Sequence, residues 1–163
     1  MAITLYSYWR SSAAYRVRIA LNLKGIDYEP APVSLKPGDD EHRKDEYRAI
    51  NPQMLVPFFD DGKVAIGQSM AILEYLEDAY PDMPLLPRTE PLRSKVRAFC
   101  NAIACDIHPL NNLRVQQYLR AELGVDDAVA MKVDGGSIGC FDASEICFRG
   151  QFDEPLTQQL FYE

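Results

Sequence analysis

The sequence has no excess of positive charge. Its 24 acidic residues outnumber 17 basic ones, and the net charge of the 163 residues is −7. Because a nucleic-acid surface requires a basic stripe, this balance argues against such a surface. It leaves room for a small anionic ligand that a few local arginines hold.

Long apolar runs and the common metal and nucleotide motifs are also missing. No run approaches the roughly 18–20 residues of a membrane span, and no signal-peptide core follows Met1. HExxH, P-loop and GxGxxG motifs are absent, and two distant histidines make a structural zinc site unexpected. The four cysteines form no CxxC pair, which predicts reduced thiols in a cytosolic protein. These cysteines are Cys100, Cys105, Cys140 and Cys147.

The first 80 residues contain a regular alternation of strand and helix patterns. Apolar residues recur at helical spacing from Ala13 to Leu21, and Gly25 stands where a C-cap glycine belongs. This order, β-α-β-α-β-β-α, predicts an α/β fold with a mixed sheet and helices on its faces. The expected elements are a strand at 3–8, the helix from Ala13, a strand at 26–33, a short polar surface helix or loop at 39–50, a hairpin over 55–67 that turns at Asp61-Gly62, and a helix over 69–80.

The second half of the chain has a different composition. "PDMPLLPRTEP" carries four prolines, which predicts a linker at 82–91 between a first domain at 1–81 and a helical domain at 92–163. One long helix is expected over 92–124, bent or broken at Pro109. After about residue 128 four glycines and no sustained period predict irregular structure.

The stretch "YWRSSAAYRVRIALNLKG" places two serines and several arginines at the start of the first helix. A helix N-terminus leaves N–H groups unpaired and carries a partial positive charge, so it favours an anion. On this interpretation a hydroxyl of Ser11 or Ser12 donates to a thiolate or carboxylate, and Arg10 adds a full charge. The simpler interpretation is that one serine is only the N-cap.

Two further segments allow both a structural and a functional interpretation. In "MLVPFF" the proline indicates an ordinary edge strand, a bulge or a cis Val56–Pro57 bond. The cis bond would turn the Val56 backbone toward a peptide ligand. Ser69 is expected as the N-cap of the next helix, with Ile72, Leu73 and Leu76 on its buried face. Gln68 and Ser69 would alternatively offer the same helix terminus to a carboxylate.

Taken together, these segments resemble the glutathione transferases, and the zeta class in particular. "SSAAYRVRIAL" is close to the serine-serine-cysteine signature of that class, whose members include maleylacetoacetate isomerase and maleylpyruvate isomerase. The resemblance runs from about Ile3 to about Ala128. It also rests on "NLKGIDYEPAPVSL", "NPQMLVPFF", "GQSMAILEYLEDAYP", "LLPR" and "CDIHPLNNLRVQQYLR".

The resemblance implies a thioredoxin-like first domain, an all-α second domain and glutathione as cofactor. Ser11 and Ser12 would stabilise the thiolate of glutathione, and Val56 before Pro57 would pair with its cysteinyl backbone. Gln68 and Ser69 would hold its γ-glutamyl carboxylate. The remaining implied residues are Gln53 and His42 toward the glycyl end, His108 and Asn112 on the second domain near glutathione, and Arg10 and Arg114 on the substrate carboxylates.

The activity that the resemblance implies is glutathione-dependent cis–trans isomerisation of maleylacetoacetate to fumarylacetoacetate in tyrosine and phenylalanine catabolism. Maleylpyruvate isomerase, a general glutathione transferase and a non-catalytic glutathione-binding module remain alternatives. A cytoplasmic homodimer is expected from the family.

The sequence departs from the family pattern at two places. Ala13 replaces the cysteine of the signature, which we expect to lower side activities rather than abolish isomerisation. Relatives continue with further helices after about residue 128, whereas the tail here lacks their helix-start motif. The tail is therefore expected to be truncated or out of frame, and the second domain incomplete.

Overall fold

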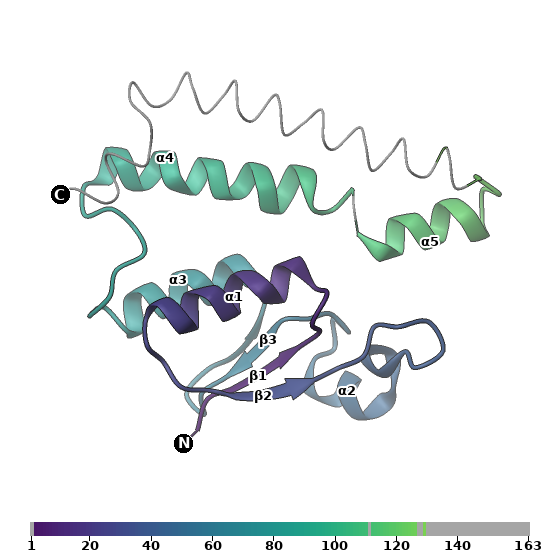
Figure 1. Ribbon diagram of the computed structural model, residues 1–163, viewed down its shortest axis with the longest axis horizontal. Helices are drawn as coiled ribbons and strands as arrows, with labels where there is room; N and C mark the ends of the chain where they lie inside the picture. Colours follow the sequence, from purple (N-terminus) through teal and green to yellow (C-terminus); the bar gives the residue numbers. More distant parts are fainter. Residues whose placement is uncertain (1, 111, 127–128, 130–163) are drawn as a thin grey trace. The chain divides into compact units, whose positions relative to one another are not determined.

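The computed structural model describes residues 2–110, 112–126 and 129. The chain divides between Leu85 and Leu86 into two compact units. The first unit contains a sheet with helices, and the described part of the second unit is helical (Figure 1).

The first unit follows the predicted β-α-β-α-β-β-α order, which is confirmed. A single 3₁₀ turn, η1, is inserted before the second helix. The elements are β1 (Thr4–Ser7), α1 (Ser12–Leu23), β2 (Glu29–Pro32), η1 (Glu41–Arg43), α2 (Asp45–Ile50), β3 (Phe58–Asp60), β4 (Ala65–Gly67) and α3 (Ser69–Ala79).

The four strands form one mixed sheet in the order β2-β1-β3-β4. Strand β1 is parallel to β2 and antiparallel to β3, and β3 is antiparallel to β4. Strands β1, β2 and β4 therefore point the same way. Their carboxyl ends meet at one edge of the sheet, where β3 begins. We call this edge the carboxyl edge.

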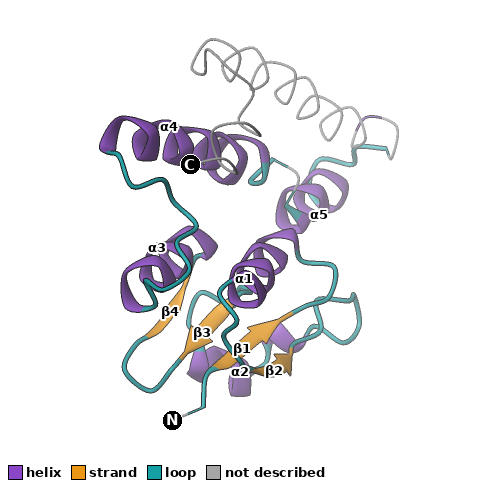
Figure 2. Ribbon diagram, turned by 60° about the vertical axis from the view of Figure 1, so that its left-hand side comes forward, coloured by secondary structure: helices purple, strands orange, loops and turns teal. Residues whose placement is uncertain are grey.

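The hydrophobic core lies between the sheet and the helices α1 and α3. Both helices lie on the same face of the sheet in two views (Figures 1 and 2). Leu5 pairs with Phe59 across β1 and β3, and both side chains are completely buried. Because strand side chains alternate between faces, these two residues share the face that the helices cover. The cluster consists of Ile3, Leu5, Val17, Ala20, Leu21, Phe59, Ile72 and Leu76.

The opposite face of the sheet is covered by aromatic packing from α2. Tyr6 pairs with Phe58 in the sheet, and the ring centroid of Tyr6 lies 6.0 Å from that of Tyr47. Tyr47 and His42 are both buried. The predicted polar surface segment at 39–50 is confirmed for most of its residues. The prediction missed the two buried side chains, of which Tyr47 packs on the face that α1 and α3 leave open.

Helix α1 ends as the sequence predicts. Gly25 has a φ of 65° and directly follows the C-cap residue Lys24. The Gly25 and Ile26 N–H groups donate to the carbonyls of Asn22 and Leu21 at 3.1 and 2.9 Å. This pair of bonds is the Schellman arrangement, which requires a left-handed residue and so favours glycine.

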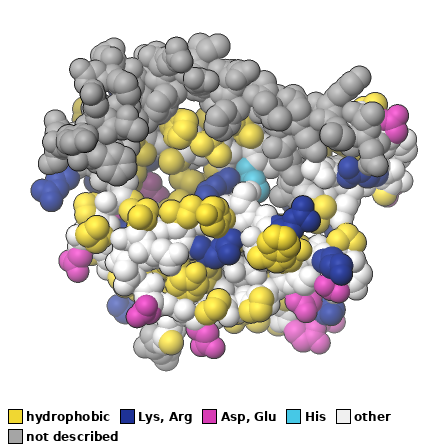
Figure 3. Space-filling model, in the orientation of Figure 1, with side chains coloured by type: hydrophobic (Ala, Val, Ile, Leu, Met, Phe, Trp, Pro, Cys, Tyr) yellow, Lys and Arg dark blue, Asp and Glu magenta, His cyan; other side chains and the backbone are white. Residues whose placement is uncertain are grey.

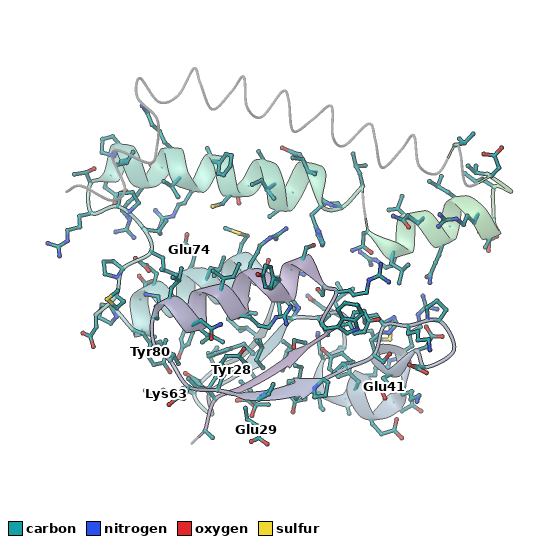
Figure 4. The ribbon with its side chains drawn as sticks, in the orientation of Figure 1. Tyr28, Glu29, Glu41, Lys63, Glu74 and Tyr80 are labelled. Atoms are coloured by element: carbon teal, nitrogen blue, oxygen red, sulfur yellow. The ribbon has the colours of Figure 1, made fainter. Side chains whose placement is uncertain are left out.

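Asp61 organises the turn between β3 and β4. Its Oδ1 accepts from the N–H groups of Lys63 and Val64, both at 2.9 Å. Its Oδ2 accepts from the hydroxyls of Tyr75 and Tyr80 at 2.6 and 3.3 Å. Burial alone would raise the pKa of Asp61, but these hydrogen bonds outweigh burial and hold the pKa at about 2. Figure 4 shows Lys63 and Tyr80 together at this end of the unit, with Glu41 at the other end.

A buried lysine joins the end of α1 to the segment that follows α3. The Lys24 Nζ lies 3.0 Å from Glu77 Oε2 and donates to the carbonyls of Tyr80 and Met83 at 2.9 and 2.8 Å. Glu77 in turn accepts from the N–H of Leu85 at 2.9 Å. The side chain of Lys24 is 1% exposed, so its charge depends on these partners.

The described part of the second unit comprises α4 (Glu90–Asn101), a π-helical turn η2 (Ala102–Ile107) and α5 (Leu113–Ala121). The predicted helix over 92–124 is broken near Pro109, as expected. The π-helical turn begins the interruption before the proline, and Asn112 caps the helix that follows it. None of the described helices is long and apolar enough to span a membrane. The expectation of irregular structure after about residue 128 falls, apart from Val129, outside the described residues.

Replacing Asp61 with asparagine is expected to lower the free energy of unfolding at pH 7 by about 2 kcal/mol, because a buried charged acceptor is lost. The folded pKa of about 2 lies below the ordinary value of 3.8, so the contribution of Asp61 is complete above about pH 5 and declines as the pH falls toward 2. Urea unfolding of both proteins should therefore show a difference that shrinks between pH 5 and pH 2.5. The exposed Asp27, changed in the same way, serves as the control, and a difference independent of pH would contradict this account.

Replacing Lys24 with methionine is expected to cost about 3 kcal/mol of unfolding free energy, because it leaves a carboxylate and two carbonyls without their donor. The same substitution at the exposed Lys36 is the matched control. Thermal and urea unfolding measure both variants. Equal stabilities of the two variants would show that the bonds of Lys24 contribute nothing net.

Candidate functional site

The sheet topology brings four segments to the carboxyl edge. They are the connection from β1 to α1, the loop after β2, the loop before β3 and the connection from β4 to α3. All predicted site residues of the first unit lie in these segments or in the first turn of the helix that follows them. They are Arg10, Ser11 and Ser12, then His42, then Gln53, Val56 and Pro57, and finally Gln68 and Ser69.

Ser11 is the N-cap of α1. Its Oγ accepts from the N–H of Ala14 at 3.2 Å, and its own N–H donates to the carbonyl of Tyr8 at 2.9 Å. The simpler prediction of a serine cap is therefore confirmed at this position. A hydroxyl that accepts one hydrogen bond keeps its proton for donation, so the cap and an anion-binding role are compatible. Ser12 is the first residue of the helix and is exposed.

Two arginines contact the segment around the start of α1 in different ways. The guanidinium of Arg10 is exposed and lies 5.6 Å from the centroid of the Trp9 ring. Arg18 donates to the carbonyl of Trp9 at 3.1 Å and lies 5.1 Å from the centroid of the Tyr15 ring. Figure 3 shows basic and hydrophobic side chains next to one another on the visible face of the first unit. Local positive charge is thus present in a protein of net charge −7.

Arg16 connects the two helix starts. Its Nη1 donates to the Oγ of Ser69 at 3.0 Å, across 53 residues of sequence. Ser69 is buried, and Arg16 is half-buried. We did not predict a site role for Arg16 from the sequence. The available signal was its position one helical turn after Ser12, which puts both residues on the same face of α1.

The start of α3 differs from the prediction at one residue. Gln68, rather than Ser69, occupies the N-cap position, and its φ is 68°. Ser69 is already helical, and its hydroxyl accepts from Arg16 instead of capping the helix. The Nε2 of Gln68 donates to the Oε1 of Gln53 at 3.0 Å, so the structure brings these two predicted residues together. Gly67 lets them approach, because a Cβ at this position would lie 3.2 Å from the same Oε1.

The loop before β3 contains the cis Val56–Pro57 bond, which confirms the predicted cis peptide in "MLVPFF". Pairing of the Val56 backbone with a peptide ligand stays a prediction. Asn51 closes the loop. Its Oδ1 accepts from the N–H of Gln53 at 3.1 Å, and its Nδ2 donates to the carbonyl of Leu55 at 2.8 Å. Met54 has a φ of 54°, an uncommon conformation for a residue other than glycine.

His42 lies in η1 and is buried rather than open to solvent. Its Nδ1 is 3.4 Å from the carbonyl oxygen of Ser34. A contact between His42 and the glycyl end of a ligand stays a prediction.

Three predicted site residues lie in the second unit. Asn112 is the N-cap of α5, and its Oδ1 accepts from the N–H of Arg114 at 3.0 Å. His108 follows the π-helical turn and donates its N–H to the carbonyl of Ile103 at 2.9 Å, while Arg114 is exposed. Their contribution to a site with the first unit stays a prediction.

The thiols and the candidate metal ligands add no second site within the described residues. Neither Cys100 nor Cys105 is part of a disulfide bond, whereas Cys140 and Cys147 lie outside the described part. In that part no group of three histidine, cysteine or acidic side chains is arranged to hold a metal ion.

Residues 5–84 match the family model for the N-terminal domain of glutathione S-transferase. The chain is 48% identical to a maleylpyruvate isomerase of a Ralstonia species over 142 residues, which are 86% of this chain and 66% of that protein. It is 50% identical to a maleylacetoacetate isomerase of Pseudomonas aeruginosa over 119 residues, 71% of this chain and 55% of that protein. The chain thus spans less than two thirds of the length of these curated relatives.

Solved structures agree with the sequence comparison. A bacterial maleylpyruvate isomerase, described as a zeta-class glutathione S-transferase, superposes with a TM-score of 0.81 at 48% identity, over 86% of this chain and 66% of that one. A maleylacetoacetate isomerase of Anaeromyxobacter dehalogenans with glutathione bound in its active site superposes with a TM-score of 0.77 at 34% identity. The match covers 91% of this chain and 69% of that one.

The resemblance inferred from the motifs is therefore confirmed, and the first unit is the thioredoxin-like domain of this family. The chain belongs to the glutathione S-transferases and groups with their zeta class.

Proposed function

We propose that this chain is a glutathione-dependent cis–trans isomerase that converts maleylacetoacetate to fumarylacetoacetate. The observation that carries the proposal is Ser11 at the N-terminus of α1, where a capping hydroxyl keeps a proton to donate. The relatives named as isomerases of cis diketo acids support the choice of reaction.

The residues at the carboxyl edge suit the parts of glutathione. The N-terminus of α3, with Gln68, Ser69 and the positive charge of Arg16, suits the γ-glutamyl carboxylate. Gln53 and His42 would contact the glycyl end, and Val56 before Pro57 the cysteinyl backbone. His108 and Asn112 would complete the site from the second unit.

The chemistry needs an ionised sulfur at neutral pH. When bound, glutathione supplies a thiolate that adds reversibly to the conjugated alkene, so that the carbon–carbon bond can rotate. Ser11 would donate its hydroxyl proton toward the sulfur with Ser12 beside it, and the partial charge of the helix N-terminus would lower the pKa of the thiol. Arg10 and Arg114 would hold the carboxylates of the substrate, for which the planar guanidinium is suited.

Maleylpyruvate is the second candidate substrate, because the Ralstonia relative named maleylpyruvate isomerase matches 86% of this chain.

We further propose a cytoplasmic homodimer. Neither Cys100 nor Cys105 is part of a disulfide bond, which agrees with a reducing compartment. Sedimentation of the purified chain tests the oligomeric state.

The assay that tests the proposal follows the ultraviolet absorbance of each cis substrate with the purified 163-residue chain. We expect isomerisation with glutathione, and none without it or with S-methyl glutathione, which cannot form a thiolate. Faster turnover of maleylpyruvate would favour the second candidate. Binding of glutathione without turnover of either substrate would overturn the isomerase proposal and indicate a binding module, and conjugation of electrophiles alone would indicate a general transferase.

Replacing Ser11 with alanine is expected to raise the pKa of the bound glutathione thiol by about one unit, which corresponds to roughly 1.4 kcal/mol. It also removes the N-cap and should cost about 1 kcal/mol of unfolding free energy. Ser11→Thr keeps both the hydroxyl and the cap, so it should restore the thiol pKa. Thiolate absorbance titrated against pH measures the effect, and an unchanged thiol pKa in the alanine variant would exclude Ser11 as the donor.

A further inference from the structure

The carbonyl oxygen of Leu55 is held by two buried donors from the face opposite α1 and α3. Tyr47 Oη donates to it at 2.7 Å and Asn51 Nδ2 at 2.8 Å. Tyr47 is 5% exposed and Asn51 is 2% exposed. Two short hydrogen bonds to one backbone oxygen fix the orientation of that peptide group.

Both donors are themselves fixed. Asn51 donates its N–H to the carbonyl of Tyr47 at 2.8 Å, and its Oδ1 accepts from Gln53. The ring of Tyr47 packs against Tyr6, and burial raises the pKa of its hydroxyl to about 12. The hydroxyl therefore stays protonated and remains a donor across the neutral range.

The orientation of the Leu55 carbonyl determines that of the next N–H group. The Leu55–Val56 peptide bond is trans, so its carbonyl and its N–H point in opposite directions. With the Leu55 oxygen directed at Tyr47 and Asn51, the Val56 N–H points away from them. Within the described residues, neither the N–H nor the carbonyl of Val56 takes part in a hydrogen bond. Backbone donors are normally paired, so this one is available to a ligand.

The loop needs this support because its backbone is constrained. Met54, two residues before Val56, lies at a positive φ of 54°, which costs about 1–2 kcal/mol for a residue with a side chain. The Met54 N–H donates to the carbonyl of Asn51 at 2.9 Å. Asn51 and Tyr47 therefore hold both ends of a segment that would otherwise relax.

We propose that Tyr47 and Asn51 are positioning residues that aim the Val56 N–H at the cysteinyl carbonyl of the bound tripeptide. This inference rests on the proposed binding of glutathione. It assigns a role to two buried residues that would not themselves contact the ligand.

The test compares glutathione with an isostere in which a trans alkene replaces the cysteinyl–glycine amide, so that the cysteinyl carbonyl is absent. Tyr47→Phe removes only the hydroxyl, and Tyr118→Phe, at an exposed tyrosine, is the matched control. By calorimetry we expect Tyr47→Phe to weaken glutathione binding about fivefold, because one well-oriented hydrogen bond is degraded. Affinity for the isostere should stay within twofold, and Tyr118→Phe should change neither value.

If the role of Tyr47 were merely structural, Tyr47→Phe would weaken the binding of both ligands equally, and that result would overturn the inference. Unchanged affinity of Tyr47→Phe for glutathione would also overturn it. If the unmodified chain does not bind glutathione at all, the proposed function fails, and this inference fails with it.

A second measurement needs no variant. The Val56 amide proton resonance of the unmodified protein should move downfield with glutathione but not with the isostere, and identical shifts would also overturn the inference.

Discussion

The directions of the strands are the constraint on which the site depends. Strands β1 and β4 run the same way because each is antiparallel to β3. Helices α1 and α3 follow these two strands, so both begin at the carboxyl edge and present their unpaired N–H groups there. The loop that leads into β3 must start at the same edge. Two helix termini and one backbone segment therefore lie around a common edge, and this is the edge to which the proposed binding of glutathione is assigned.

Local patterns explain why much of this arrangement could be predicted from the sequence. The element order, the end of α1 at Gly25, the hairpin turn and the capping serine each depend on residues within a few positions of one another. The proline in "MLVPFF" likewise signalled an unusual backbone, although its sequence left an edge strand and a cis bond equally open. The interruption near Pro109 could be predicted because proline removes a helical donor.

The contacts that complete the site were not predictable in this way. The bond from Arg16 to Ser69 joins residues 53 positions apart, and no period in either helix indicates it. Gln68 takes the N-cap because the chain turns through a positive φ there, a conformation that glutamine does not favour by itself. The segment at 39–50 has a polar sequence, yet Tyr47 is buried, because the uncovered face of the sheet supplies an aromatic partner for it. Tertiary surroundings overrode local preference in each case.

The two ends of the first unit differ in how completely their polar groups are paired. At the end opposite the carboxyl edge, charged groups have their partners, as the bonds of Asp61 and the Lys24–Glu77 pair show. At the carboxyl edge the backbone carries Met54 and Gln68 at positive φ, and the Val56 N–H has no acceptor among the described residues. Such uncommon conformations persist only where their surroundings hold them. The paired network at one end of the sheet, together with the core between the sheet and α1 and α3, stabilises a fold whose other end keeps these conformations and the unpaired Val56 N–H.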